Sequence, residues 1–170
     1  YSVETLRAFA ESQTKEIAPI IHASEAFFHE YPDLCESFET EIYKLRGRSR
    51  FKRIMTESTE FRRRARGVQG VHHFGGHLPL FSPRPTAVTV HDLQPLDIPE
   101  NFSLLKRLYF KFVLPTSIKS ADLVVTVSGA VSDQINKQFE ISKEFLRTVP
   151  IGVTRIETEP VEPKRPPVII

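Results

Sequence analysis

The sequence predicts an α/β domain built on a Rossmann-like, doubly wound parallel sheet. Apolar and β-branched runs, which favour strands, alternate along the chain with segments whose apolar residues recur at helical spacing. This alternation is typical of βαβ units, whose strands pair in parallel. Residues 121–127 are almost continuously apolar, as strands buried on both faces of a parallel sheet are. A chain of 170 residues is long enough for one well-buried domain.

The composition is that of an ordinary globular protein, with 40% apolar and 26% charged residues. The sequence contains no run of about 18 apolar residues, so it predicts no membrane-spanning helix. Its first residues lack the pattern of a signal peptide. The single cysteine, Cys35, excludes a disulfide within the chain and is compatible with a reducing cytosol.

The first third of the chain is predicted from periodicity. Residues 1–14 place their apolar side chains on one face, which favours an amphipathic helix. Residues 17–22 favour a strand, although Pro19 weakens this prediction because proline donates no hydrogen bond to a sheet. Residues 25–34 fit no single element. Residues 38–45 fit strand and helical spacing alike, and their position before a loop and a clear helix favours a strand.

The middle of the chain gives clearer signals. Ser49 is expected to be the N-cap of a helix that ends at Arg66 and is closed by Gly67. Residues 68–74 are predicted to form a strand. The β-branched run of residues 86–90, bounded by prolines, predicts a second, short and buried strand.

Ser103 is expected to cap the next helix, which is kinked or ended near Pro115. Its apolar side chains are expected to face the core. Those side chains are Leu104, Leu105, Leu108, Phe112 and Val113.

The remaining elements complete the alternation. Residues 121–127 form a predicted strand, and Ser128 caps a helix that runs to residue 139. A short turn at residues 142–146 leads to a last short strand at residues 147–149. This succession supports the parallel, doubly wound architecture.

We expect three parts in the domain organisation. Residues 1–156 form the Rossmann-like domain, and residues 157–167, with four prolines, form an interdomain linker. Residues 168–170 are expected to begin a second domain. Because the chain starts without methionine inside a predicted helix and stops in an apolar run, we expect it to be part of a longer protein.

The candidate site lies between residues 71 and 97, which hold four of the six histidines. The predicted strand of residues 86–90 ends in His91 and Asp92. The preceding strand ends in the same way, and its residues at that edge are His72, His73, Gly75, Gly76 and His77. Ligands bind at the carboxyl edge of an open α/β sheet, so these residues are the best candidates for a binding site.

Two interpretations of the His91-Asp92 pair remain open. The imidazole and carboxylate could bind a polyhydroxylated or phosphorylated ligand at the end of the strand. Alternatively, Asp92 caps the following turn and His91 is a half-buried core histidine, an interpretation that the dipeptide alone favours. Metal-dependent phosphohydrolases also use a His-Asp pair, but they place it on helices with further ligands, which a strand end does not match.

The pattern His72-His73-x-x-x-His77 raises the possibility of a metal site. Adjacent residues of a strand point to opposite faces, so at most two of the three imidazoles converge. No cysteine is near, and the first carboxylate that follows the histidines along the chain is Asp92. We therefore predict no metal. The glycine pair in the loop is expected to allow a tight turn where the backbone approaches a ligand or a neighbouring loop.

Residues 44–66 form a basic segment, with ten Lys or Arg and two acids, a local charge of +8 in a chain whose net charge is +2. Arg62, Arg63 and Arg64 lie beside an apolar stripe, which suits a helix on an anionic membrane surface. A solvated face whose stripe packs on the sheet is an equal alternative. No aromatic residues interleave the charges as a single-stranded nucleic-acid platform requires, so no nucleic-acid partner is predicted.

Taken together, several runs resemble the amino-terminal domain of a family 4 (GT-B fold) glycosyltransferase. They cover about half of the chain, residues 68–153, in matching order and spacing. The matching runs are Val71–Pro79, Thr89–Pro95, Pro99, Phe102–Ser103, Ala121–Ser128 and Val149–Val153. Residues 1–67 fit the pattern only loosely.

The resemblance implies one of two Rossmann-like domains that face each other across a cleft. This domain would bind the acceptor, which could be a sugar, a lipid-linked molecule or a small molecule. A carboxy-terminal domain would bind the nucleotide-sugar donor. Transfer would retain the anomeric configuration without a cofactor or an obligatory metal, in the cytoplasm or at the inner face of the membrane. The 170-residue chain alone would be inactive.

The resemblance also implies roles for individual residues. His91 would sit against the donor sugar, and Asp92 would shape the same turn. The loop from His72 to His77 would line the acceptor side, and Pro150 and Gly152 would approach the interdomain crevice. The glycine-rich loop that follows the first strand of such enzymes is absent from these residues. The competing hypothesis is a non-enzymatic α/β ligand-binding or interaction module, whose basic helix docks an acidic partner or a membrane.

Overall fold

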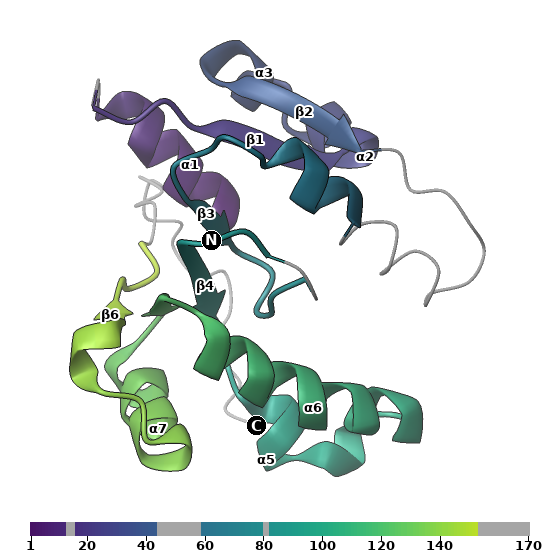
Figure 1. The fold of residues 1–170 in the computed structure, drawn as a ribbon, viewed down its shortest axis with the longest axis vertical. Coiled ribbons are helices and arrows are strands. Elements are labelled where there is room, and N and C mark those ends of the chain that lie inside the picture. The colour runs from purple at the N-terminus through teal and green to yellow at the C-terminus, as the bar shows by residue number, and fades with distance from the viewer. Residues whose placement is uncertain (13–15, 44–58, 80–81, 153–170) are drawn as a thin grey trace, which may run out of the picture.

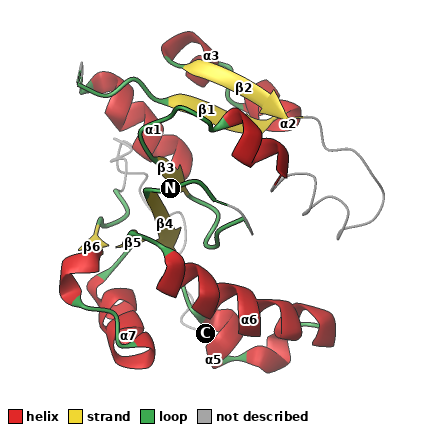
Figure 2. Cartoon of the chain, viewed as in Figure 1, coloured by secondary structure: helices red, strands yellow, loops and turns green. Residues whose placement is uncertain are grey.

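A computed structural model describes residues 1–12, 16–43, 59–79 and 82–152 of the chain (Figure 1). The expected linker at 157–167, the expected start of a second domain at 168–170 and the N-cap Ser49 lie outside the described residues. Helices and parallel strands alternate along the described chain (Figure 2). The structure therefore confirms the predicted α/β class.

All strand pairs in the described chain are parallel, and they form two sheets. The first joins β1 (Ile20–Ser24) to β2 (Glu39–Tyr43). The second has four strands in the order in which they follow one another along the chain. These strands are β3 (Val71–His73), β4 (Thr86–Val90), β5 (Leu123–Thr126) and β6 (Leu146–Thr148). Because neighbouring strands are parallel, their carboxyl ends lie along one edge of the sheet.

The amino-terminal part packs around the two-stranded sheet. The predicted first helix is α1 (Ser2–Glu11). The first strand begins three residues later than predicted, directly after Pro19, which has no N–H to offer a sheet. The Ser24 hydroxyl then accepts a hydrogen bond from the backbone N–H of Phe27 and begins a helix.

The segment of residues 25–34, which fitted no single element, holds α2 (Glu25–Glu30) and the beginning of α3 (Asp33–Ser37). Both helices contribute to a small core whose buried members are Ile21, Phe28 and Leu34. The prediction of a strand in residues 38–45 is confirmed by β2. Helical spacing in so short a run carried less weight than its parallel pairing with β1.

Only the end of the helix expected from Ser49 to Arg66 is described. Residues 59–64 are helical, and a turn follows. Gly67 closes that turn with a φ of 92°, a left-handed conformation that glycine adopts without penalty.

The main core lies at the four-stranded sheet. Short connections and helices α5 (Gln94–Asp97), η1 (Pro99–Asn101) and α6 (Leu104–Ser120) join β4 to β5. Helix α7 (Gly129–Phe139) and the turn η2 (Lys143–Phe145) join β5 to β6. The buried residues of this core are Val88, Val90, Leu93, Ile118, Val124, Ile135 and Leu146.

The two serines predicted to cap α6 and α7 differ in whether their side chains make a capping hydrogen bond. Ser128 caps α7 through its hydroxyl, which accepts from the N–H of Val131 at 3.3 Å. Ser103 occupies the N-cap position of α6 but makes no capping hydrogen bond with its side chain. The strand predicted at residues 121–127 is shorter, because Ala121 ends α6 and Ser128 begins α7.

Two expectations for α6 need correction. Of the kink or end expected near Pro115, the end does not occur, because the helix continues for five more residues to Ser120. The side chains that it buries are Leu114, Ser117 and Ile118. Of the side chains expected to face the core, Leu104, Leu105, Leu108 and Phe112 are instead exposed. Apolar residues occur on every side of this helix, so periodicity could not select the buried face, and packing on the sheet outweighs the hydrogen bond lost at proline.

No helix in the described part of the chain is long and apolar enough to cross a membrane.

Candidate functional site

The loops after β3 and β4 meet at the carboxyl edge of the four-stranded sheet. The strands pair in register, with His73 beside Val88. The chain then leaves β3 through a loop with two glycines and leaves β4 through His91 and Asp92. Together with α6 these loops enclose a pocket of about 180 Å³. Its lining residues are Gly75, Gly76, His77, His91, Asp92, Pro95, Phe110 and Leu114.

His91 is held in place by the neighbouring loop. Its Nε2 lies 2.9 Å from the carbonyl oxygen of Phe74. A carbonyl oxygen can only accept, so Nε2 carries the hydrogen and Nδ1 is the acceptor of the neutral ring. The ring of Tyr1 approaches the imidazole edge-on, with 5.3 Å between the centroids. These contacts fix the orientation of a half-buried imidazole that lines the pocket.

Asp92 stabilises the following turn, as one of the two interpretations expected, and it also lines the pocket. Its Oδ1 accepts a hydrogen bond from the backbone N–H of Gln94 at 3.0 Å, so the carboxylate stabilises the turn that leads into α5. The same exposed side chain lines the pocket beside His91. A carboxylate has several acceptor positions, so capping leaves it able to accept from a bound hydroxyl group.

His77 and the glycine pair also line the pocket. Nδ1 of His77 donates to the carbonyl oxygen of Gly75 at 3.0 Å, and its ring meets Tyr109 of α6 edge-on at 6.0 Å. Gly76 has a φ of 79°, which requires glycine, whereas a Cβ at Gly75 would meet open space. The N–H of Leu78 donates to the buried hydroxyl of Ser117 at 2.9 Å. Helix α6 thus supports the loop from behind.

His72 and His73 do not line this pocket. Nε2 of His72 lies 2.8 Å from the hydroxyl of Thr89, and its ring stacks on Phe74 at a centroid distance of 4.1 Å. Nε2 of His73 lies 2.8 Å from the hydroxyl of Ser82 instead. The adjacent imidazoles therefore engage different partners, as expected for successive residues of a strand. Their proposed contact with substrate stays a prediction.

Burial keeps both imidazoles neutral. Loss of hydration lowers the pKa of His72, although part of its ring remains exposed. The pKa of His73 falls to about 4, first because of burial and then because of repulsion from His72 and His77. At neutral pH these two rings act as hydrogen-bonding groups of the sheet rather than as charged binding groups.

Pro150 and Gly152 follow β6 at the same edge of the sheet. The N–H of Val149 donates to the carbonyl oxygen of Thr126 at 2.8 Å, which extends the ladder just before them. Both residues are exposed and lie outside the pocket lining. Their expected position at an interdomain crevice stays a prediction.

The described chain offers little for a metal ion. Within the residues that the structure describes, no three His, Cys, Asp or Glu side chains gather as a metal site would require. His72 and His73 bind separate hydroxyl groups, and His77 binds a backbone carbonyl. The three imidazoles therefore do not form a ligand set.

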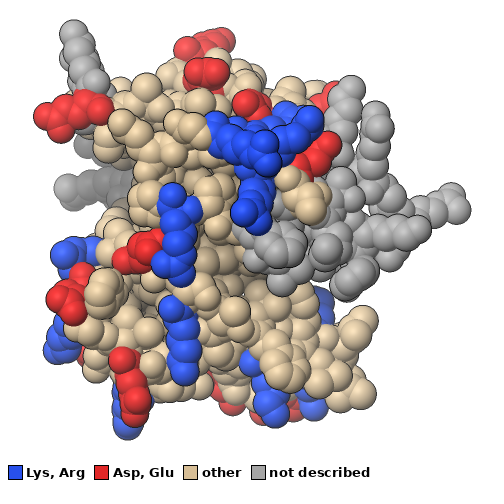
Figure 3. Space-filling view, viewed as in Figure 1, with Lys and Arg blue, Asp and Glu red and all other residues tan. Residues whose placement is uncertain are grey.

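The arginines of residues 62–64 lie on the helix next to β2, where Figure 3 shows Lys and Arg atoms close to acidic ones. Arg64 lies 3.4 Å from a carboxylate oxygen of Glu41 and 3.6 Å from one of Glu60. Arg63 lies 3.9 Å from the other carboxylate oxygen of Glu60. Phe61 faces inward, between the rings of His22 and His73. The role of Arg62, Arg63 and Arg64 in binding an anionic surface stays a prediction.

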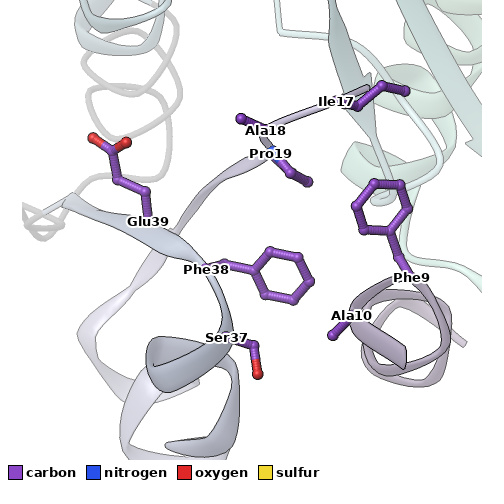
Figure 4. Close-up of a pocket in the computed structure, with 8 residues that line it drawn as sticks. All are labelled: Phe9, Ala10, Ile17, Ala18, Pro19, Ser37, Phe38 and Glu39. Atoms are coloured by element: carbon purple, nitrogen blue, oxygen red, sulfur yellow. The ribbon is translucent and has the colours of Figure 1, made fainter. Parts of the chain in front are cut away.

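A second pocket, of about 300 Å³, lies between α1 and the two-stranded sheet (Figure 4). The rings of Phe9 and Phe38 point toward each other across it, with 6.2 Å between their centroids, whereas Glu39 points away. Among its described lining residues Glu39 is the one ionisable side chain. This pocket holds no pair of groups suited to acid, base or nucleophilic chemistry.

Sequence reasoning missed the contribution of α6 to the site. Phe110 and Leu114 lie 15 or more residues from the histidine loops in sequence, and the pocket takes one apolar wall from them. No local pattern marks these two residues, because α6 is apolar on several sides. Pro95, by contrast, adjoins the His91-Asp92 turn and lay within the predicted stretch.

Comparison with known proteins identifies the family. A family model described as Glycosyltransferase Family 4 matches residues 19–155, most of the chain. The chain is also 35% identical over 66 residues to the O-antigen chain mannosyltransferase RfbU of Salmonella typhimurium. That match covers 39% of this chain and 18% of the relative, so the matched segment spans less than a fifth of that protein. On the family match, this chain belongs to Glycosyltransferase Family 4.

Proposed function

We propose that this chain is the acceptor-side domain of an enzyme that transfers a sugar from a nucleotide-sugar donor to an acceptor with retention of anomeric configuration. Membership of Glycosyltransferase Family 4 supports glycosyl transfer in general. The observation that carries the proposal is the oriented His91 beside Asp92, in a pocket at the carboxyl edge of the sheet. The donor sugar, the acceptor and the location in the cytoplasm or at its membrane face are parts of this proposal.

Sugar transfer needs groups that orient hydroxyls and groups that stabilise a departing nucleoside diphosphate. His91 and Asp92 can perform the first task, by donating to and accepting from hydroxyl groups. For the second, none of the described residues that line the pocket is Lys or Arg. The volume of about 180 Å³ is also below the ~300–1,000 Å³ of complete ligand pockets. Both facts support a site that a second domain completes. The proposal includes no cofactor besides the donor.

The test measures donor turnover by the whole protein that carries this chain. Because the relative is a mannosyltransferase, a nucleoside diphosphate mannose is the first donor to try. We expect His91→Ala to lower the release of nucleoside diphosphate by roughly 100-fold, the size of effect seen when one oriented hydrogen-bonding group is removed. His91→Gln keeps an N–H able to reach the carbonyl of Phe74, so it separates loop support from direct contact with the sugar. We expect it to lose turnover as well.

The control is His29→Ala, which removes an exposed imidazole on α2 far in sequence from the pocket. It should leave turnover unchanged, and all three variants should keep the thermal unfolding temperature of the parent. Full activity of His91→Gln would contradict contact between this imidazole and the sugar. If no nucleotide-sugar is consumed while the parent still binds an acceptor or an acidic partner, the enzyme proposal fails. The non-enzymatic binding module then takes its place.

A further inference from the structure

The outward side of α6 exposes a stripe of large apolar side chains. Leu104, Leu105, Leu108 and Phe112 are 73%, 74%, 50% and 67% exposed. At 3.6 residues per turn these four positions fall within an arc of about 100°, so they form one continuous surface, here called the α6 stripe. Single exposed apolar residues are common, but a continuous apolar surface of this kind marks a place that a partner or a membrane covers.

The α6 stripe lies on a helix that is anchored from its other side. Leu114 and Ile118 are 4% and 1% exposed, and Ser117 binds the N–H of Leu78. Phe110 and Leu114 line the candidate pocket. Other side chains therefore pack α6 against the domain, and the α6 stripe remains available for another contact.

The charge of α6 favours an anionic partner. The helix carries four basic residues and no acidic residue. These residues are Lys106, Arg107, Lys111 and Lys119. The nearest acids in sequence are Asp97 and Glu100 before the helix and Asp122 after it. Asp97 accepts a hydrogen bond from Gln134 at 2.7 Å, and Asp122 lies 2.9 Å from Arg84. In Figure 3 the surface over α6 is mostly tan, with basic side chains at intervals.

We propose that the α6 stripe docks this domain on an anionic lipid surface. An interfacial helix needs an apolar face of leucine and phenylalanine that enters the boundary between headgroups and acyl chains, with lysine and arginine to meet the anionic headgroups. The α6 stripe supplies the first and the four basic residues supply the second. A second copy docked through the same surface would bring two helices of the same positive net charge together, which charge repulsion opposes.

This docking surface differs from the basic segment that the sequence alone suggested. Arg63 and Arg64 lie within salt-bridge distance of Glu60, and Arg64 also reaches Glu41. The aromatic ring of that helix, Phe61, packs inward against His22 and His73. Helix 59–64 thus combines partly neutralised charge with an apolar face that is already covered, whereas α6 has exposed apolar side chains and no acids.

The docking places the candidate site near the membrane. An α-helix with its side chains is about 10–12 Å thick. The α6 stripe is on one side of that thickness, and Phe110 and Leu114 contribute to the pocket on the other. A bilayer in contact with the α6 stripe would therefore lie about one helix diameter from His77 and His91.

The test is co-sedimentation with vesicles, without donor or acceptor, so its outcome is independent of glycosyl transfer. The whole protein is incubated with vesicles of equal parts phosphatidylcholine and phosphatidylglycerol, or with pure phosphatidylcholine. We expect binding to the anionic vesicles that weakens as salt increases. We expect the double variant Leu105→Ser/Phe112→Ser to bind them at least about tenfold more weakly, because both side chains enter the interface.

Two matched controls sharpen the test. Ile17→Ser/Phe145→Ser removes two apolar side chains that are 61% and 47% exposed elsewhere on the surface, and it should bind as the parent does. Lys106→Glu/Lys111→Glu should lose anionic binding, whereas the same change at Arg62 and Arg63 should retain most of it. These substitutions are at exposed positions, and circular dichroism checks that each variant is folded.

Several outcomes would overturn the proposal. Failure of the parent to sediment with anionic vesicles, or equally tight binding to neutral vesicles, would contradict docking on an anionic surface. Binding of Leu105→Ser/Phe112→Ser as tight as that of the parent would place membrane contact elsewhere. If light scattering instead shows dimers that this variant dissociates, the α6 stripe is a contact between copies of the chain.

Discussion

The imidazole of His91 donates through Nε2 to the carbonyl oxygen of Phe74, so the loop after β3 sets the orientation of a residue on the loop after β4. Asp92 accepts from the N–H of Gln94 in the same turn. Neither interaction is between the two members of the pair. The loop after β3 holds His91, whereas Asp92 is held within its own turn after β4. Both residues line one pocket. Single-residue variants at this site therefore test contact with ligand only if the support of the loop is preserved.

The lowered pKa of His73 predicts how the stability of the folded chain depends on pH. Its pKa is about 4 in the folded chain, against 6.5 for a solvated histidine. As pH falls below about 6.5, the unfolded chain binds a proton that the folded chain still refuses, so stability is fully present above that pH and declines toward about pH 4. A difference of this size corresponds to at most about 3 kcal/mol. Burial lowers the pKa of His72 and His22 as well, which adds a decline in the same direction.

Urea unfolding at several pH values between 4 and 7.5 measures this decline. His73→Gln retains a group that can hydrogen-bond the hydroxyl of Ser82 but cannot titrate, so its stability should fall less steeply as the solution is acidified. His29→Ala, at an exposed position, should keep the slope of the parent. A parent whose stability is constant from pH 7.5 to 4.5 would contradict the burial of His73.

At the scale of elements, helix α6 has one face in the core and another in contact with solvent. Its inner face buries Leu114, Ser117 and Ile118 against the sheet and the histidine loop, and its outer face exposes the α6 stripe. Helix α7 is simpler, because Ser128 caps it, Ile135 is its buried residue and Glu140 ends it in a left-handed conformation. Local sequence signals suffice for α7, whereas tertiary packing decides the orientation of α6.

The orientation of α6 predicts unequal costs for two similar substitutions. Leu114→Ala removes a side chain that is 4% exposed and should lower the free energy of unfolding by about 2–5 kcal/mol. Leu108→Ala removes one that is 50% exposed and should change it by at most about 0.5 kcal/mol. Chemical denaturation of both variants measures the difference. Equal losses would mean that Leu108 belongs to the core, as helical periodicity first suggested.

At the scale of the whole molecule, we propose that the described domain supplies one side of a reaction centre. The carboxyl edge of its sheet offers hydrogen-bonding groups in a small pocket, and none of the described lining residues is a Lys or Arg that could stabilise a departing diphosphate. The matched segment spans only 18% of the mannosyltransferase relative. The proposed transfer therefore depends on groups outside this pocket.

We accordingly expect the isolated 170-residue chain to release no measurable nucleoside diphosphate from a nucleotide-sugar, even when an acceptor is present. The whole protein, assayed alongside, is the positive control. Circular dichroism of the isolated chain shows whether it is folded under the conditions of the assay. Turnover by the isolated chain at a rate near that of the whole protein would contradict a site divided between two domains.

Much of the fold followed from the sequence because its signals are local. Alternating strand and helix patterns gave the parallel α/β class, and Ser128 and Gly67 marked helix ends through capping and a positive φ. The placement of His91 and Asp92 at the carboxyl edge of the sheet also followed, because parallel strands end together. The weakest predictions were in residues 25–34, where two short helices replace any single periodic pattern.

The sequence by itself therefore determined the class of fold, the order of its strands and the edge at which the candidate site lies. Only the tertiary structure decided which histidines line the pocket, because His72 and His73 turn to hydroxyl groups that are distant in sequence. It also decided which face of α6 is buried. That helix is apolar on several sides, so its periodicity was ambiguous until packing against the sheet selected Leu114 and Ile118 and left the α6 stripe exposed.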